Sequence, residues 1–142
     1  WEGQSKLWEE VRALRRSQER LTISFEEEAR EVVRGRLREA LGVEIELDRL
    51  YFDDEELDLY GVVDDLVVVG EVSLRVGSSL VEELLEKVER LSRDKPYLLR
   101  RRVVKVIYAS VATPEALRLA LERKVWIATI RGDLTPLAVE ER

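Results

Sequence analysis

The sequence predicts a single α/β domain in which a mixed sheet is flanked by helices. Segments with apolar residues every three or four positions alternate with short runs rich in valine, leucine and isoleucine. Three of these runs are consecutive, and two later runs are separated by a short helical segment. The predicted order is therefore helix, three strands, helix, strand, helix, strand. Meandering strands followed by a β-α-β unit form a mixed sheet, and 142 residues suit one domain.

An N-terminal helix is predicted from about Gln4 to Leu21. Its apolar residues form a short heptad-like seam in which Gln18 fills the remaining place: Leu7, Val11, Leu14 and Leu21. Such a seam indicates packing on the domain or on a second copy of the chain. The more specific hypothesis is a short coiled-coil dimer contact. We therefore divide the chain into a helical extension, residues 1–22, and a domain, residues 23–142.

A second helix is predicted from Phe25 to Leu41, because Ser24 and Glu27 form a capping box and Gly42 is a natural stop. At about 100° per residue, Glu26 falls inside the apolar arc of this helix. An acid in that position needs a partner; the alternative is a first-turn acid favoured by the helix dipole. Glu28 lies at the edge of the arc and is the reserve candidate for a functional acid.

Three strands follow, over residues 43–48 (extending at most to 52), 56–63 and 66–76, with Asp64-Asp65 as the second turn. The third strand is apolar on both faces at its start and on one face at its end. One face is expected to carry Val68, Val72, Leu74 and Val76. The other is expected to carry Val67, Val69, Glu71, Ser73 and Arg75. This pattern is typical of a central strand that places polar residues at the edge of the apolar core.

The remaining elements are a helix over residues 79–92, a strand over 103–111, a short helix from Thr113-Pro114 to Arg123 and a strand over 125–130. Trp126 stands between apolar neighbours in the last strand and is predicted to be a core residue. The first of these helices is expected to face the core with Leu80, Leu84, Leu85, Val88 and Leu91.

The composition restricts the chemistry. Histidine, cysteine and methionine are absent, which excludes disulfides, thiol chemistry, histidine bases and the usual zinc sites. Metal chemistry must then use oxygen ligands, which suits magnesium, manganese or calcium. A charged fraction of 38% with few oxidisable residues is typical of a heat-adapted cytoplasmic protein. No apolar run approaches the roughly 18 residues of a membrane span, and no signal peptide is visible.

The predicted hairpin carries two acids that can meet. Asp58 lies in its first strand, with Glu56 and Tyr60 on the same face and Leu57 and Leu59 expected to face the core. Glu71 lies in the second strand. Two neighbouring carboxylates repel each other and need a cation or a proton between them. Carboxylates that hold one or two magnesium ions are what phosphodiester hydrolysis requires.

Glu56-Leu57-Asp58, a short hairpin and then Glu71-Val72-Ser73 resemble the PD-(D/E)XK nuclease superfamily. The resemblance covers residues 25–130 and implies a restriction-endonuclease-like αβββαβ core. The chain looks closest to thermophile-type members with an N-terminal coiled-coil helix, and more distantly similar to archaeal Holliday-junction resolvases. The resemblance to this superfamily implies a metal-dependent endonuclease that hydrolyses DNA phosphodiester bonds.

By this resemblance, Asp58 and Glu71 bind Mg2+ or Mn2+, the backbone carbonyl of Val72 is a further ligand, and Glu56 and Glu26 support the site. The departure is Ser73, which stands where the family carries a lysine that orients or activates the attacking water. Arg75, roughly 7 Å further along the same face, can stabilise charge but is no base near neutral pH. Lys87, on the following helix, is the other possible replacement.

The densest basic cluster consists of Arg100, Arg101 and Arg102 with Lys95 and Lys105 nearby. It is expected to bind phosphate backbones, or else to be a solvated rim in a chain whose net charge is -6. Two other functions stay open beside the nuclease. One is a catalytically inactive nuclease fold that binds nucleic acid or a protein, which Ser73 favours. The other is an assembly module in which the N-terminal helix is the working part, as in a homodimer.

Overall fold

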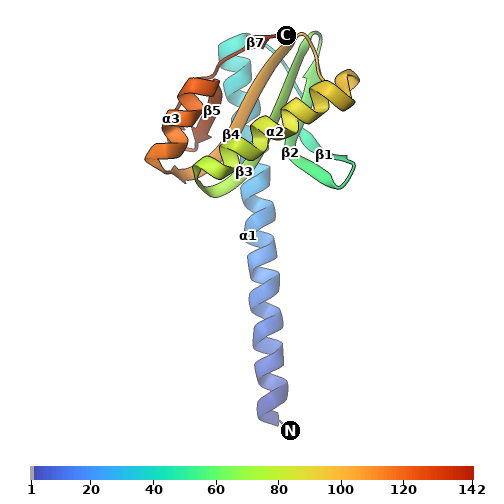
Figure 1. The fold of residues 1–142 in the computed structure, drawn as a ribbon. Coiled ribbons are helices and arrows are strands. Elements are labelled where there is room, and N and C mark those ends of the chain that lie inside the picture. The colour runs from blue at the N-terminus through green and yellow to red at the C-terminus, as the bar shows by residue number, and fades with distance from the viewer. Residues whose placement is uncertain (1) are drawn as a thin grey trace.

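A single seven-stranded sheet organises the molecule. The computed structural model describes the backbone of residues 2–142 and, before Ser24, only the side chains of Glu9, Glu10 and Arg12. Helix α1 covers one face of the sheet, and helices α2 and α3 cover the other (Figure 1). The predicted order of a helix, three strands, a helix and a strand around a mixed sheet is confirmed.

Helix α1 runs without a break from Glu2 to Leu41. The predicted break between a helix ending at Leu21 and a second helix starting at Phe25 is therefore wrong, because the residues before Phe25 are mostly good helix formers that continue the helix through the capping-box sequence. The N-terminal part of α1 projects away from the sheet, and the part from Phe25 onward packs on it (Figure 1). The side chains of the predicted seam, Leu7, Val11, Leu14 and Leu21, lie outside the described residues.

The segment after α1 crosses the sheet instead of joining it. Residues 43–47 were expected to form a strand, but the first strand, β1, begins at Asp48. Ile45 and Leu47 are buried against α1, which produces the alternation that resembles a strand. The carbonyl of Glu46 approaches so close to Gly61 that a Cβ built there would lie 2.2 Å from it. The crossing thus requires a glycine at position 61.

The strands follow the order β1-β2-β3-β4-β5-β6, and β7 pairs with β4. β1, β2 and β3 are antiparallel, whereas β3, β4 and β5 are parallel. The two-residue strands β6 and β7 were not predicted because they are too short to show a period. The bounds are β1 Asp48–Phe52, β2 Glu55–Val63, β3 Leu66–Val76, β4 Arg102–Ala112, β5 Val125–Thr129, β6 Gly132–Asp133 and β7 Glu140–Glu141.

Helices α2 (Ser78–Asp94) and α3 (Pro114–Arg123) connect the parallel strands, and a 3-10 turn, η1 (Pro96–Leu98), follows α2. The hydroxyl of Thr113 accepts a hydrogen bond from the Ala116 N–H, so the predicted start of α3 is confirmed. In α2, Leu84 and Leu91 are buried as expected, and Val81 joins them. Among the residues that the structure describes, no helix has the length and apolar character needed to cross a membrane.

Each face of the sheet has its own apolar core. The core under α1 contains Val68 and Trp126, and the core under α2 and α3 contains Val67 and Val69. Val76 was expected on the same face of β3 as Val68, and this is wrong. Val76 packs in the α2 core, because the chain turns there into α2. Leu74 is 64% exposed, since α1 does not cover this end of the strand.

Gly70→Ala is expected to destabilise the domain by about 1–3 kcal/mol, the usual cost of overpacking. A Cβ at this position would lie 2.3 Å from the Val106 carbonyl oxygen, and a backbone atom in a parallel ladder cannot swing aside. The measurement is chemical unfolding beside Gly35→Ala, whose new methyl group meets nothing within 4 Å. Because alanine favours a helix, Gly35→Ala should gain up to about 1 kcal/mol. Equal midpoints for both variants would contradict the prediction.

Candidate active site

A β-bulge in β2 sets the position of Asp58. Asp48 pairs with Tyr60 and Leu50 pairs with Leu57, so β2 has one more residue than β1 between these pairs. The surplus lies at Asp58 and Leu59, opposite Arg49. A bulge reverses the alternation of side chains and can redirect a residue. Leu57 and Leu59 are accordingly buried in opposite cores, which corrects the expectation that they share one face.

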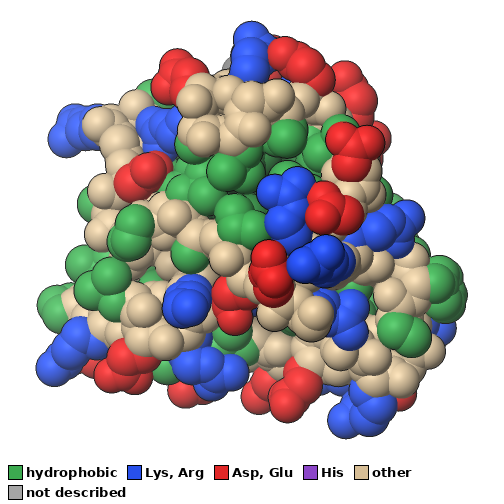
Figure 2. Space-filling view, turned by 90° about the horizontal axis from the view of Figure 1, so that it is seen from above, with side chains coloured by type: hydrophobic (Ala, Val, Ile, Leu, Met, Phe, Trp, Pro, Cys, Tyr) green, Lys and Arg blue, Asp and Glu red, His purple; other side chains and the backbone are tan. Residues whose placement is uncertain are grey.

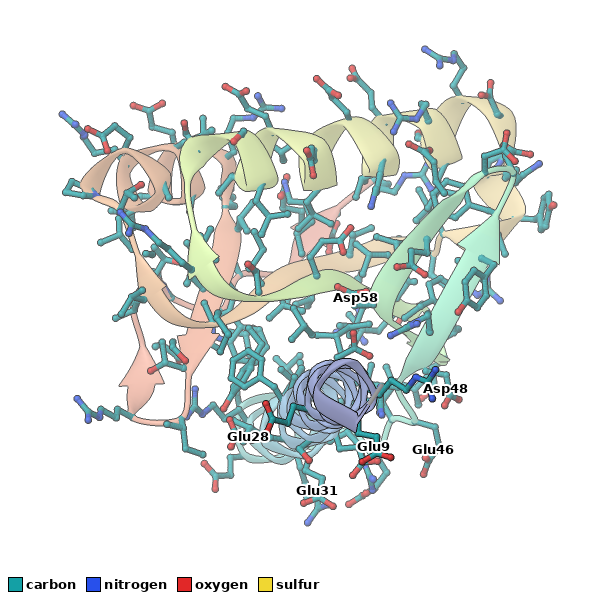
Figure 3. All side chains as sticks on the ribbon, turned by 90° about the horizontal axis from the view of Figure 1, so that it is seen from below. Glu9, Glu28, Glu31, Glu46, Asp48 and Asp58 are labelled. Carbon is teal, nitrogen blue, oxygen red and sulfur yellow. The ribbon has the colours of Figure 1, made fainter. Side chains whose placement is uncertain are left out.

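The strands β2 and β3 separate just beyond this bulge. Their register ends at Leu59 opposite Gly70. Beyond it, the Val72 N–H donates to Asp58 Oδ2 at 2.9 Å, so a side-chain oxygen replaces the missing backbone acceptor. Figure 3 shows Asp58 at the level of the sheet, between the layers of α1 and α2. This bond fixes the Asp58 carboxylate beside Glu71.

Glu71 is 5% exposed and faces α2. Lys87 of α2 places its Nζ 2.6 Å from Glu71 Oε1 and also donates to the backbone carbonyl of Glu56 at 2.7 Å. Burial raises the pKa of Glu71; the hydrogen bond from Lys87 opposes this, and the neighbouring Asp58 adds to it, so that the pKa is about 7. An acid, its like-charged neighbour and a half-buried lysine therefore meet where the strands separate.

Glu26 and Glu56 are held together by Arg49. The guanidinium group of Arg49 forms an ion pair with Glu26 and lies 3.9 Å from Glu56 Oε2. It also donates to the hydroxyl of Tyr51 at 3.3 Å, and these partners raise its pKa. Arg49 could not be predicted from the sequence, because only the register between β1 and the bulged strand β2 brings it to these acids. The predicted need of Glu26 for a partner is thus met by Arg49.

Glu28, the reserve candidate, has a different partner. It accepts a hydrogen bond from the hydroxyl of Tyr108 at 2.6 Å. Burial, followed by the effect of Glu28, raises the pKa of Tyr108 well above its usual range. The ring of Tyr108 is fully buried and lies 5.3 Å from that of Phe25. This contact fixes α1 on the sheet and leaves Glu28 outside the Asp58–Glu71 site.

Ser73 and Arg75 do not reach the two carboxylates through any hydrogen bond or ion pair that the structure describes. The Ser73 hydroxyl donates to the Arg75 carbonyl at 2.9 Å, and the Arg75 side chain is exposed. Of the two predicted replacements for the missing lysine, Lys87 is therefore the one that contacts Glu71.

The three arginines of the basic cluster lie at the other end of the sheet. Arg102 pairs with Leu66, five residues before Glu71 and thus roughly 17 Å from it along the strand. Figure 2, viewed from the end opposite the projecting part of α1, shows basic and acidic side chains intermixed. Arg100 donates to the carbonyls of Tyr97 and Leu99. The other members have acidic partners: Lys95 with Asp53, Arg101 with Glu141, Arg102 with Asp65 and Lys105 with Glu140.

Two carboxylates of this site can serve a metal ion. In the part of the chain that the structure describes, no three acidic side chains come together closely enough to hold one. Magnesium needs fewer, because it is commonly bound by one or two carboxylates with water and substrate phosphate completing the shell. Asp58 and Glu71, with the backbone carbonyl of Val72, fit that requirement. Glu26 and Glu56, engaged by Arg49, stand apart from the pair.

Comparison with known proteins gives a family and a structural neighbour. A repair endonuclease from Pyrococcus abyssi matches with a TM-score of 0.49 and 19% sequence identity, over 72% of this chain. The match spans 46% of that structure, about half of its length. No curated protein matches the chain. The model of a family described as "Domain of unknown function (DUF8196)" matches residues 27–137, which is more than half of the chain. The chain therefore belongs to this family, DUF8196.

Proposed function

We propose that this protein is a metal-dependent nuclease of the PD-(D/E)XK type that hydrolyses DNA phosphodiester bonds at Asp58 and Glu71. The observation that carries the proposal is the meeting of these two carboxylates with Lys87 where β2 and β3 separate. Lys87 would replace the motif lysine that is missing at Ser73. The exposed Arg75 has a weaker case, since it has no contact with either carboxylate among the described residues.

The local charge supports a divalent cation. Four carboxylates, those of Glu26, Glu56, Asp58 and Glu71, are matched by two cations, Arg49 and Lys87. When all are ionised, Asp58, Glu71 and Lys87 carry a formal sum of -1, and the neighbouring group of Glu26, Glu56 and Arg49 adds another -1, so a bound Mg2+ or Mn2+ would have acidic surroundings. Without a metal ion, a proton on Glu71 relieves part of this charge, in keeping with its raised pKa. A bound ion would lower the pKa of a coordinated water and neutralise phosphate charge.

Lys87 is well placed to orient a nucleophile. Its ammonium group has three donors, and the described contacts with Glu71 and the Glu56 carbonyl use two of them. The third donor can hold a water or a phosphate oxygen next to Glu71. Fixing the ammonium group with two acceptors from different strands limits its movement, and such positioning is what catalysis requires.

The N-terminal part of α1 is proposed to form a homodimer through residues 1–22. An isolated helix of this length is marginal in water, and the predicted seam supplies an apolar stripe for a second copy. Deleting residues 2–21 should give a monomer in which the metal site is unchanged.

We further propose a cytoplasmic, heat-adapted protein on grounds of composition.

The test is cleavage of labelled single-stranded, duplex and branched DNA with Mg2+ or Mn2+ at elevated temperature. We expect cutting that a chelator stops and that Asp58→Asn abolishes. Asparagine can still accept the bond from Val72 N–H, so the fold should be kept. Asp65→Asn is the matched control, because Asp65 lies at the far end of the same hairpin and pairs with Arg102.

Other outcomes decide against the enzyme. Cutting by Asp58→Asn at the native rate would place the chemistry elsewhere. No cutting on any substrate, together with no uptake of metal by calorimetry, would overturn the nuclease proposal. In that case, binding of DNA without metal would support the alternative of an inactive nuclease fold, which the serine at position 73 favours.

A further inference from the structure

Arg49 and Tyr51 form an exposed surface beside the proposed active site. Both belong to β1, the edge strand of the sheet, and they lie two residues apart on one face of it. The neighbouring Phe52 points the other way, into the core under α2. Tyr51 is 66% exposed, so a face of its ring is open to solvent. Its hydroxyl accepts a hydrogen bond from Arg49.

This surface is connected to the carboxylates by direct contacts. Arg49 pairs with Glu26 and lies 3.9 Å from the Glu56 carboxylate, and the Glu56 carbonyl accepts from Lys87. Lys87 in turn contacts Glu71. The bulge that positions Asp58 lies directly opposite Arg49. In the register of β1 and β2, Tyr51 pairs with Glu56, two residues before Asp58 and thus roughly 7 Å from it along the strand.

The chemistry of the pair fits an unpaired nucleotide. An exposed ring offers a stacking face to any base, and such stacking tolerates every sequence. An arginine has five N–H donors, and the described contacts of Arg49 occupy only some of them, so donors are left for a phosphate oxygen. Bases inside a duplex already stack on each other and present no free face.

We propose that Arg49 and Tyr51 bind a single-stranded nucleotide next to the scissile phosphate: Tyr51 stacks on its base, and Arg49 holds its phosphate. The inference rests on the proposed nuclease function and assigns its substrate class, a nucleic acid that is unpaired where it meets the site. It gives the protein a surface for single-stranded nucleic acid that is distinct from the arginines of the basic cluster at the opposite end of the sheet.

The experiment measures binding of fluorescent single-stranded and duplex DNA by anisotropy, with Mg2+, in the Asp58→Asn background, which removes cleavage and one repelling charge. Adding Tyr51→Ala should weaken single-strand binding about tenfold and leave duplex binding unchanged, whereas Tyr51→Phe should bind like the parent. Tyr97→Ala is the matched control, because Tyr97 is 70% exposed but lies on η1, next to the arginines of the basic cluster. Adding Arg49→Gln should lower the salt slope by about 0.7, the value for one phosphate of a single strand.

The possible results test the nucleotide-binding surface separately from the nuclease function on which it rests. If the parent binds single strands and Tyr51→Ala binds them equally well, the stacking surface is wrong and the nuclease proposal stands. A parent that prefers duplex DNA also overturns the inference. If the parent binds neither form and the native chain does not cut, both proposals fail together. Circular dichroism of each variant verifies that the fold is retained.

Discussion

Glu71→Gln is expected to make the domain less sensitive to alkaline pH than the native chain. The free-energy advantage of the variant should grow by about 2–3 kcal/mol between pH 5 and pH 8. The reason is the raised pKa of Glu71, from its ordinary 4.5 to about 7, which is caused first by burial, opposed by Lys87 and reinforced by Asp58. Glutamine resembles the protonated acid and carries no such titration.

The sign follows from proton binding. Between pH 4.5 and 7 the folded chain keeps the proton on Glu71, whereas the unfolded chain has released it. Where the folded state binds more protons, the free energy of unfolding falls as pH rises. The contribution of Glu71 is therefore fully favourable below its unfolded pKa and is lost as pH rises through its folded pKa. An acid with a lowered pKa would behave in the opposite way.

The measurement is chemical unfolding of both chains from pH 5 to pH 8, without metal and then with Mg2+. A cation at the site favours the ionised carboxylate, so Mg2+ should stabilise the native chain more at pH 8 than at pH 5.5. It should have little effect on Glu71→Gln. Parallel pH profiles for the two chains would show that Glu71 titrates normally and that the pair with Lys87 suffices to keep it ionised.

The sequence predicted the elements with long, regular patterns. The bounds of β3 match the expectation, β2 differs by one residue at its start, and β4 and α2 differ by one or two residues at both ends. β3 and β4 bury continuous apolar runs, β2 buries alternate residues and α2 buries one apolar face, so local pattern and tertiary packing agree. The strand expected before Asp48 failed because Ile45 and Leu47 alternate for a different reason, which is their burial against α1.

The site could be predicted only in part, because its residues come from separate strands and a helix. Asp58 and Glu71 were identified from the hairpin, and Lys87 was one of two candidates that spacing could not separate. Which of them reaches Glu71 depends on the rotation of α2 over the sheet. Arg49 could not be identified from the sequence, since its position opposite the bulge depends on how β1 and β2 pair. A shift of one residue in that pairing would move every side chain of the strand to the opposite face.

Lys87→Met is expected to lower the rate of DNA cleavage about 100- to 10,000-fold, the range for losing a positioned proton-transfer or water-orienting group. Methionine keeps the length and the apolar stem of lysine but removes the ammonium group that contacts Glu71. Arg90→Met is the matched control. Arg90 lies one turn further along α2 and pairs with Glu55 at the start of β2, so its loss breaks a similar ion pair away from the carboxylates.

A structural role for Lys87 would give a different result from a catalytic one. If the lysine only neutralises Glu71, Lys87→Met should raise the pKa of Glu71 further, and raising the pH or the Mg2+ concentration should restore the rate. If it orients the nucleophile, neither change should restore it. Arg75→Met tests the other candidate: because Arg75 is exposed, this variant should cut at close to the native rate. If Lys87→Met cut DNA at the native rate and Arg75→Met did not cut it, Arg75 of β3 would be the residue that replaces the missing lysine.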